Sequence, residues 1–201
     1  MGQTTRERLL TLARKRPILR TADVARHGLH TQLLTRLVAD GSLERVGRGR
    51  YRSPDATITE HHGLALTAAA APRGVVCLLS ALVFHGVGTQ NPSEIWVALD
   101  RRARAPKVAW PPLRVVRFSG RALTEGVETH QIEGESVRVY SLPKTIADCF
   151  KYRSKLGMEV ALEALKDAWN RRRIRMAELD AYARVCRVER VMRPYLEALS
   201  A

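Results

Sequence analysis

Residues 31–52 read TQLLTRLVADGSLERVGRGRYR, and this stretch decides the fold of the first part of the chain. Apolar residues at helical spacing predict a helix over 31–40, which ends at Gly41. Two short extended pieces follow around a Gly-Arg-Gly tip, a pattern typical of a β-hairpin. A helix followed at once by a basic hairpin is the second half of a winged helix-turn-helix.

The residues before this stretch predict the first half of the same motif. Thr4 and Glu7 have the spacing of a capping box at the start of a helix that extends to about Arg16. A second, short helix is expected to begin at Thr21 as its N-cap and to end in a tight turn. The order of helix, short helix, turn, helix and basic hairpin predicts a winged helix-turn-helix domain over residues 1–55.

This motif suits duplex DNA. A helix of about three turns fits the major groove, and a hairpin beside it reaches the backbone or the minor groove. Gly49 at the hairpin tip lets the backbone approach a phosphate closely. The predicted DNA contacts come from the polar face of the third helix and from the arginines of the hairpin: Thr31, Gln32, Thr35, Arg36, Arg45, Arg48, Arg50 and Arg52.

The same residues also fit roles other than DNA contact. A small basic domain with solvated arginines would bind a protein instead. Arg36 has the spacing to pair with Asp40, one helical turn further on. Tyr51 is expected to be structural, with its ring on the inner face of the hairpin against Leu37 or Leu43.

The charge of the chain favours a polyanionic partner. Its 34 Lys and Arg stand against 20 Asp and Glu, a formal net charge of +14. Residues 1–55 hold 12 of these cations and 5 of these anions, a net charge of +7. Nucleic acid is the commonest partner of such a surface, and membrane surfaces are the rival. The N-terminal segment is therefore the stronger candidate for touching nucleic acid.

The cysteines and the apolar stretches point to a cytoplasmic protein without a membrane partner. Cys77, Cys149 and Cys186 are odd in number and widely spaced, so they suggest neither a disulfide framework nor a zinc site. No apolar run of signal-peptide length follows the first charges, and the nearly uncharged stretch 63–71 is too short to span a bilayer.

The remainder of the chain, residues 60–201, is predicted to form a second, mixed α+β domain after a linker over 55–60. The whole chain is thus expected to be α+β, with a winged helix-turn-helix followed by a domain with a small sheet and C-terminal helices. Helices are expected over 61–71 and 79–85, strands over 94–99, 113–118, 127–132 and 136–140, and helices again from Pro143, with breaks near Gly157, 173–175 and Pro194.

Three segments in this order resemble the AbiEi family of antitoxins: Gly47–Tyr51, Leu79–Val87 and Tyr140–Asp148. The resemblance implies a DNA-binding transcriptional autorepressor and antitoxin of a type IV toxin–antitoxin pair, active in phage defence. It implies two partners, double-stranded operator DNA and a nucleotidyltransferase toxin that the C-terminal domain counters, with direct contact between the two proteins left open. Lys144 departs from the acidic or amide residue that is usual in the family.

The residues of the third segment suggest a mainly architectural role. Pro143 suits the first turn of a helix. Thr145 and Asp148 are placed to cap that helix or to bond the end of the preceding strand, and Ile146 and Phe150 face the core. A catalytic Asp148 is the less favoured alternative.

Two functions of other classes compete with the antitoxin. One is a stand-alone winged-helix regulator whose C-terminal domain senses a ligand. The other is a metal-dependent nuclease, which needs acidic residues followed shortly by a lysine, whereas Asp100 is followed by arginines. Phosphate loops and nucleophile motifs are also missing from the sequence. We therefore expect no enzyme, no catalytic residue, no cofactor and no metal site.

Two basic runs lie in the second region. Residues 171–175 follow a predicted helix, whose dipole favours cations at that end. The other run lies in a predicted loop and is the candidate for contact with tRNA or flanking operator DNA. It consists of Arg101, Arg102, Arg104 and Lys107.

Overall fold

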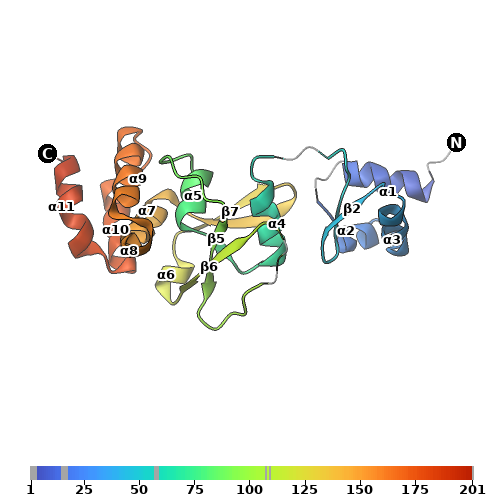
Figure 1. Ribbon diagram of the computed structural model, residues 1–201, viewed down its shortest axis with the longest axis horizontal. Helices are drawn as coiled ribbons and strands as arrows, with labels where there is room; N and C mark the ends of the chain where they lie inside the picture. The colour runs from blue at the N-terminus through green and yellow to red at the C-terminus, as the bar shows by residue number, and fades with distance from the viewer. Residues whose placement is uncertain (1–3, 15–17, 57–58, 107, 109, 201) are drawn as a thin grey trace.

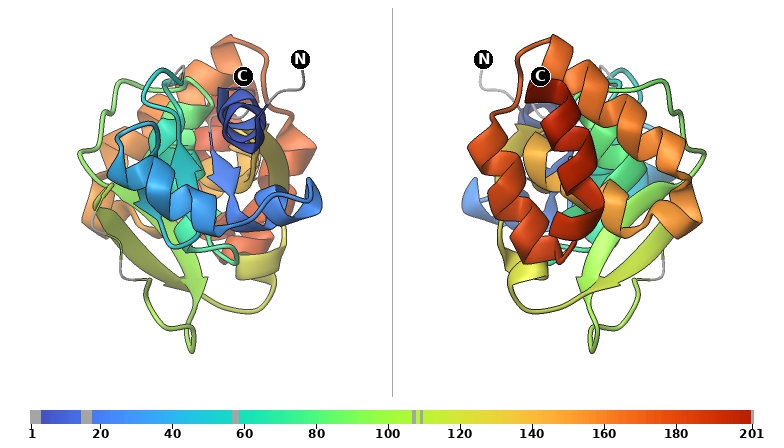
Figure 2. Two further views of the ribbon diagram at one scale, coloured as in Figure 1. Left: turned by 90° about the vertical axis from the view of Figure 1, so that its right-hand side faces the viewer. Right: turned by 90° about the vertical axis from the view of Figure 1, so that its left-hand side faces the viewer.

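The computed structural model describes residues 4–14, 18–56, 59–106, 108 and 110–200. Figure 1 shows an elongated molecule: a helical unit with a hairpin at one end, a sheet in the middle and a group of helices at the other end. Figure 2 looks along the long axis from both ends, onto the N-terminal unit on the left and onto the C-terminal helices on the right. The predicted α+β class, with a winged helix-turn-helix followed by a mixed domain, is confirmed.

The N-terminal unit, the described part of residues 4–56, has the elements of a winged helix-turn-helix. Its hairpin is joined by a short strand that the sequence did not predict, in the order β1-β3-β2. The elements are α1 (Thr5–Arg14), β1 (Leu19–Arg20), α2 (Thr21–Arg26), α3 (Gln32–Ala39), β2 (Glu44–Gly47) and β3 (Arg50–Arg52). Tyr51 packs against the apolar cluster of this unit, which includes Leu37 and Leu43, as predicted.

The capping residues at the helix starts of this unit agree with the sequence-based prediction, with one exception. The capping box of α1 is formed, since the Glu7 N–H donates to Thr4 Oγ1 and the Thr4 N–H to Glu7 Oε2. Thr21 was wrongly predicted as the N-cap of α2. The N-cap is Arg20, whose N–H donates to Asp23, while the Thr21 hydroxyl donates to the Gly49 carbonyl at the hairpin tip. The predicted end of the first helix near Arg16 lies outside the described residues.

The second unit is built on a mixed sheet of order β6-β5-β4-β8-β7. β5 and β6 run parallel, as do β4 and β8, and the remaining neighbours are antiparallel. The predicted hairpin is β7 and β8, which turn at Glu133 and Gly134, both at positive φ. The strands are β4 (Val75–Val76), β5 (Ile95–Asp100), β6 (Leu113–Phe118), β7 (Val127–Ile132) and β8 (Glu135–Tyr140).

Helices pack on this sheet, and the last of them form a group at the C-terminal end of the molecule (Figure 1). The helices are α4 (His62–Ala70), α5 (Leu78–Phe84), α6 (Arg121–Thr124), α7 (Leu142–Lys151), α8 (Arg153–Leu156), α9 (Met158–Asn170), α10 (Met176–Cys186) and α11 (Glu189–Ser200). The predicted break at Pro194 was wrong, because Pro194 lies inside α11. Burial of Met192 and Leu196 on either side holds the helix together despite the backbone hydrogen bond that proline cannot donate.

Lys144 and Asp148 form a buried ion pair on α7. Lys144 Nζ lies 2.6 Å from Asp148 Oδ2, and both side chains are almost fully buried. The ammonium group also sits over the Tyr140 ring at 4.2 Å, and the Cys186 thiol donates to Asp148 Oδ1. Burial raises the pKa of Asp148, although its lysine partner acts in the opposite direction. This enclosure favours the architectural interpretation of Asp148 over a catalytic one.

Thr145, one turn earlier on the same helix, bonds the preceding strand as predicted. Its hydroxyl donates to the carbonyl of Tyr140, the last residue of β8. His85 Nε2 lies 2.8 Å from the same carbonyl, and burial lowers the pKa of this imidazole. The end of β8 is therefore bonded by the side chain of His85, the C-cap residue of α5, and by that of Thr145 on α7.

Replacement of Asp148 by asparagine is expected to destabilise the protein by about 3–5 kcal/mol, because the Lys144 ammonium would stay buried without its counter-charge. The double variant Lys144→Met with Asp148→Leu should recover most of this loss, since it removes both charges. Urea denaturation followed by circular dichroism measures both changes. A loss below about 1 kcal/mol for Asp148→Asn would show that the pair is not held as described.

Candidate nucleic-acid interface

The polar face of α3 is open to solvent. Thr31 is the N-cap residue, and Gln32, Thr35 and Arg36 follow on the helix, all four exposed. The alternative pairing of Arg36 with Asp40 is not formed. Asp40 bonds Ser42 and Arg6 instead, and these contacts lower the pKa of Asp40 to about 2. Among the described residues Arg36 thus has no acidic partner.

The arginines of the hairpin, the wing of the motif, divide into two pairs. Arg45 and Arg48 are exposed and contact no carboxylate of the described chain. Arg50 and Arg52 are half-buried: Arg50 Nε lies 3.6 Å from Glu135, and Arg52 donates to Glu44. Contact with DNA stays a prediction for all four, and these surroundings favour it for Arg45 and Arg48.

Two buried carboxylates flank the glycine of the turn between β7 and β8, and one of them contacts the N-terminal unit directly. Glu135, with 4% of its side chain exposed, accepts a hydrogen bond of 2.8 Å from Arg20 Nε and lies near Arg50. The neighbouring Gly134 carbonyl accepts a further bond from Arg20. One turn of the second unit thus binds two arginines of the N-terminal unit.

Glu133, on the other side of the turn, bonds residues at the start of the second unit. Its Oε2 lies 2.5 Å from His62 Nδ1, and its Oε1 accepts two bonds of 2.9 Å from the N–H and hydroxyl of Thr59. Burial acts to raise the pKa of Glu133, but the bonds from His62 and Thr59 outweigh it and lower the pKa below the usual 4.5. The other ring nitrogen of His62 lies 3.5 Å from Arg52 of the wing.

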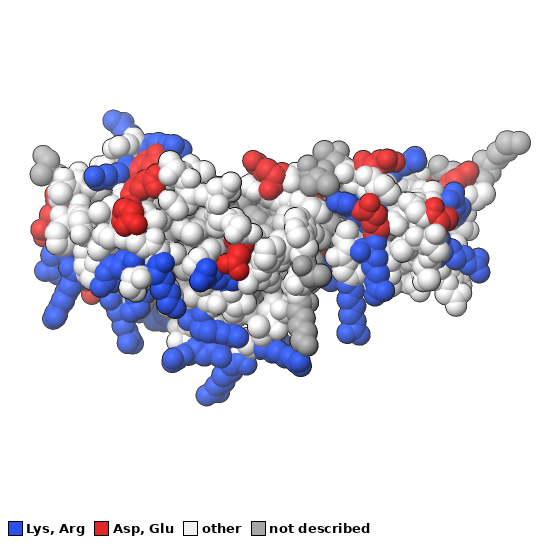
Figure 3. All heavy atoms as spheres, in the orientation of Figure 1, with Lys and Arg blue, Asp and Glu red and all other residues white. Residues whose placement is uncertain are grey.

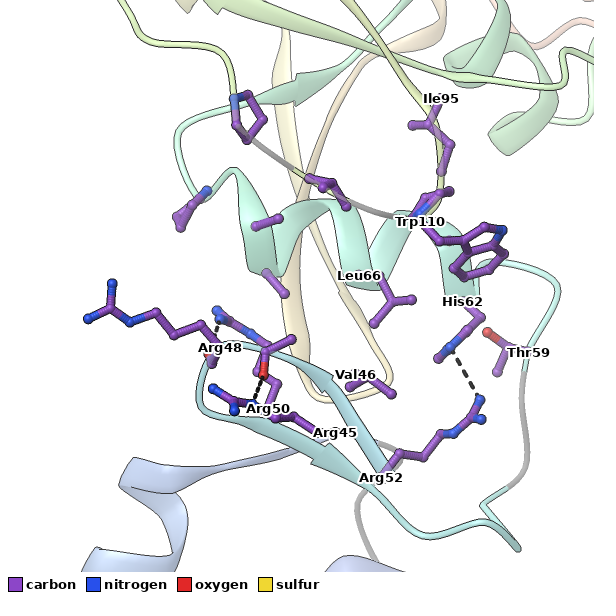
Figure 4. A pocket seen from close by; sticks show the side chains of 18 of the residues that line it. Arg45, Val46, Arg48, Arg50, Arg52, Thr59, His62, Leu66, Ile95 and Trp110 are labelled. Atoms are coloured by element: carbon purple, nitrogen blue, oxygen red, sulfur yellow. Dashed lines mark hydrogen bonds between the residues drawn. The ribbon is translucent and has the colours of Figure 1, made fainter. Parts of the chain in front are cut away.

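Between the wing and α4 lies an open groove with a volume of about 1480 Å³. Figure 4 shows Arg45, Arg48 and Arg50 together on the wing side, with His62 and Trp110 at the far end of the groove. The groove is lined by Arg45, Val46, Gly47, Arg48, Arg50, Arg52, Thr59, Glu60, His62, Gly63, Leu66, Ala69, Ala70, Pro72, Ile95, Pro106, Val108, Trp110 and Pro111.

The basic loop of the second unit presents its cations outward. Arg101, Arg102 and Arg104 are exposed, and no acidic partner approaches them within the described chain. Arg117 of β6 fixes the loop by donating to the carbonyls of Asp100 and Ala103, at 2.9 and 2.6 Å. Figure 3 shows Lys and Arg gathered along the lower edge of the molecule, below both units. Lys107, the fourth predicted residue of this run, lies outside the described residues.

Over the residues that the structure describes, no group of three or more His, Cys, Asp or Glu is arranged to hold a metal ion. Within the same ranges no helix has the length and apolar character needed to cross a membrane.

Comparison with known proteins bears on the first unit. Residues 7–54 match the family model described as a transcriptional regulator, AbiEi antitoxin. The predicted resemblance to AbiEi antitoxins is confirmed over this region. The match begins within α1 and ends after β3, so it includes α3 and the wing, which carry the predicted DNA contacts of this unit. It supports a role as a DNA-binding regulator.

Comparison of whole structures shows the fold alone. The chain resembles the crystal structure of the RV2827C protein from Mycobacterium tuberculosis, with a TM-score of 0.61 and 14% sequence identity. The match covers 91% of this chain and 72% of that one, so it extends over residues of both units. A comparison with curated protein sequences finds no match.

Sequence reasoning missed the buried side of this interface. Glu133 and Glu135 appear in the sequence only as polar residues of a hairpin turn, and His62 as one of two adjacent histidines. One signal was present, since a carboxylate on each side of a turn glycine is available to arginines of another unit. Which side chains these carboxylates contact depends on how the two units dock, and the local sequence does not encode this.

Replacement of Glu133 by glutamine is expected to lower the free energy of unfolding by about 1–3 kcal/mol near pH 7, because the bonds to a charged acceptor are lost. Because the pKa of Glu133 is lowered on folding, its carboxylate contributes fully to the free energy of unfolding above about pH 4.5. This contribution is lost as the pH falls through the pKa of Glu133 in the folded protein. The gap between the parent and Glu133→Gln should therefore narrow below about pH 4.5.

Urea titrations at several pH values measure this gap. Glu128→Gln, on the exposed face of the same hairpin, is the matched control and should change the stability by less than about 0.5 kcal/mol. A gap for Glu133→Gln that stays constant from pH 7 to pH 4 would contradict the assignment.

Proposed function

We propose that this protein is a DNA-binding autorepressor and the antitoxin of a type IV toxin–antitoxin pair. The observation that carries the proposal is the exposed polar face of α3, beside the free wing arginines, within the region that matches AbiEi regulators. The helix offers hydroxyl, amide and guanidinium groups to base edges, which is the chemistry of major-groove readout. The operator would lie upstream of the gene pair.

Each predicted contact residue takes a role that follows from its surroundings. Gln32 and Thr35 are proposed to read bases, with Thr31 and Arg36 beside them. Arg45 and Arg48 are proposed to bind phosphates, because their guanidinium groups face solvent without a carboxylate. Arg50 and Arg52 contribute positive potential from their places at the unit interface, close to the DNA but held by acidic partners.

The second unit is proposed to extend the contact with nucleic acid. Its loop exposes Arg101, Arg102 and Arg104 to solvent, and Figure 3 shows Lys and Arg side chains along one edge of the molecule, below both units. Phosphates of operator DNA beyond the half-site read by α3 would meet these side chains. Each neutralised phosphate releases counterions, so a longer footprint steepens the dependence of affinity on salt.

The toxin countered by this protein is proposed to be a nucleotidyltransferase encoded beside it. This part of the proposal rests on the AbiEi match, whose description names an antitoxin. Neutralisation without catalysis by this chain is consistent with the enclosure of Asp148 and Lys144 in the core, away from any substrate. Direct contact between toxin and antitoxin is not required.

Replacement of Gln32 by alanine is expected to relax sequence preference, with a loss of about 1–3 kcal/mol for the operator and little change for a scrambled duplex. Arg48→Ala should weaken both duplexes alike and lower the slope of log affinity against log salt by about 0.9. Mobility-shift titrations with upstream DNA and a scrambled duplex, at several salt concentrations, separate these effects. Arg190→Ala, an exposed arginine of α11, is the control and should leave both affinities unchanged. Operator binding that survives both changes would refute the assignment of α3 and the wing.

Co-expression with the neighbouring nucleotidyltransferase tests the antitoxin role. The full chain should restore growth, and Gln32→Ala should restore it equally when transcribed from an independent promoter, since neutralisation is assigned to the second unit. Colony counts under induction are the measurement. Failure of the parent chain to restore growth would leave a DNA-binding regulator without antitoxin activity.

A further inference from the structure

The groove between the wing and α4 lies apart from the face of α3 that is proposed to read duplex DNA. Its lining comes from both units: the wing on one side, and on the other side α4 with Pro106, Val108, Trp110 and Pro111. The duplex-reading role of α3 leaves this groove without an assigned ligand. Its charge, its apolar wall and its volume together specify one.

Part of the positive charge on the wing side of the groove has no acidic partner in the described chain. Four arginines line the groove, and two of them are paired, Arg50 with Glu135 and Arg52 with Glu44. The other two, Arg45 and Arg48, contact no acidic group of the described chain. An anionic ligand would pair with these two guanidinium groups.

The opposite side is apolar and ends in an exposed aromatic ring. Gly63, Ala69 and Ala70 give α4 a surface of small side chains there. Trp110 is 57% exposed, and its ring centroid lies 6.0 Å from that of His62. Exposing an indole costs hydrophobic free energy, and aromatic rings beside cationic grooves serve as stacking platforms for the bases of single strands.

The wing and α4 are in contact along the groove, since Val46 packs against the apolar cluster that contains Leu66, and both residues line the groove. The volume of about 1480 Å³ exceeds the 300–1,000 Å³ typical of small-molecule pockets, so the site suits several nucleotides rather than one.

We propose that this groove binds single-stranded nucleic acid, with phosphates on Arg45 and Arg48 and bases stacked on Trp110. An acidic peptide would satisfy the arginines but would leave the indole without a planar partner. The site does not depend on the proposed reading of operator DNA by α3. Arg45 and Arg48 are also the proposed phosphate contacts of duplex DNA, so a strand in the groove and a duplex against the wing would share these two side chains.

Fluorescence anisotropy of labelled oligo(dT) and oligo(U) 12-mers, titrated with the full chain, tests this proposal. The parent should bind both oligonucleotides, with equal affinity or with a preference for the deoxyribose or the ribose backbone. Binding should quench tryptophan fluorescence. Trp110→Ala should weaken strand binding about 5- to 150-fold, the range expected for loss of one stacking platform, while operator-duplex binding is unchanged. Trp110→Phe should recover most of the affinity without the quenching, because the remaining Trp96 is buried and Trp169 lies on α9.

Two controls separate this site from the duplex site and from general charge. Gln32→Ala should leave strand binding intact, and Val83→Ala, an exposed apolar side chain on α5, should change nothing. Equal strand affinity for the parent and Trp110→Ala would overturn the proposal. So would polyglutamate that displaces the oligonucleotide at equal charge concentration, because the groove would then recognise acidic chains without regard to bases. Loss of operator binding alone would count against the function of α3 and not against the groove.

Discussion

The contact on which the rest of the structure depends is the insertion of the β7–β8 turn into the N-terminal unit. Glu135 binds Arg20 and lies near Arg50 of that unit. Glu133, on the other side of Gly134, binds Thr59 and His62 of the second unit, and His62 in turn lies 3.5 Å from Arg52 of the wing. Carboxylates so deeply buried are tolerated only where every oxygen meets a donor or a cation. The energetic cost of breaking one such contact fixes the orientation of the wing relative to the second unit.

This constraint explains the uneven distribution of charge. Acidic side chains that would otherwise compensate the wing arginines are withdrawn into the interface, where they bind Arg20 and hold Arg50. The outward cations, among them Arg48 and Arg101, keep no acidic neighbours in the described chain. Figure 3 shows Lys and Arg side chains gathered along one edge of the molecule, below both units. Since the units are held in one orientation, that edge presents positive charge from both of them to a polyanion.

The sequence predicted the elements well and their mutual contacts less well. Helical spacing over 31–40 and the Gly-Arg-Gly tip led directly to α3 and the wing, because both signals are local. β1 and β4 were missed because each has two residues and exists only through pairing with distant strands. Pro194 was misjudged because burial of its neighbours, a tertiary effect, outweighs its local preference.

The wing arginines show which part of the site the sequence could not predict. Side chains alternate along a strand, so placing Tyr51 on the core face already put Arg50 and Arg52 together on the other face. That other face is covered by the second unit, whose position no local pattern encodes. Arg50 and Arg52 therefore stabilise the interface, while Arg45 and Arg48 remain available to an anion. The same docking that withdraws two arginines from solvent creates the groove beside the other two, so the number of free wing cations and the existence of the groove have one physical cause.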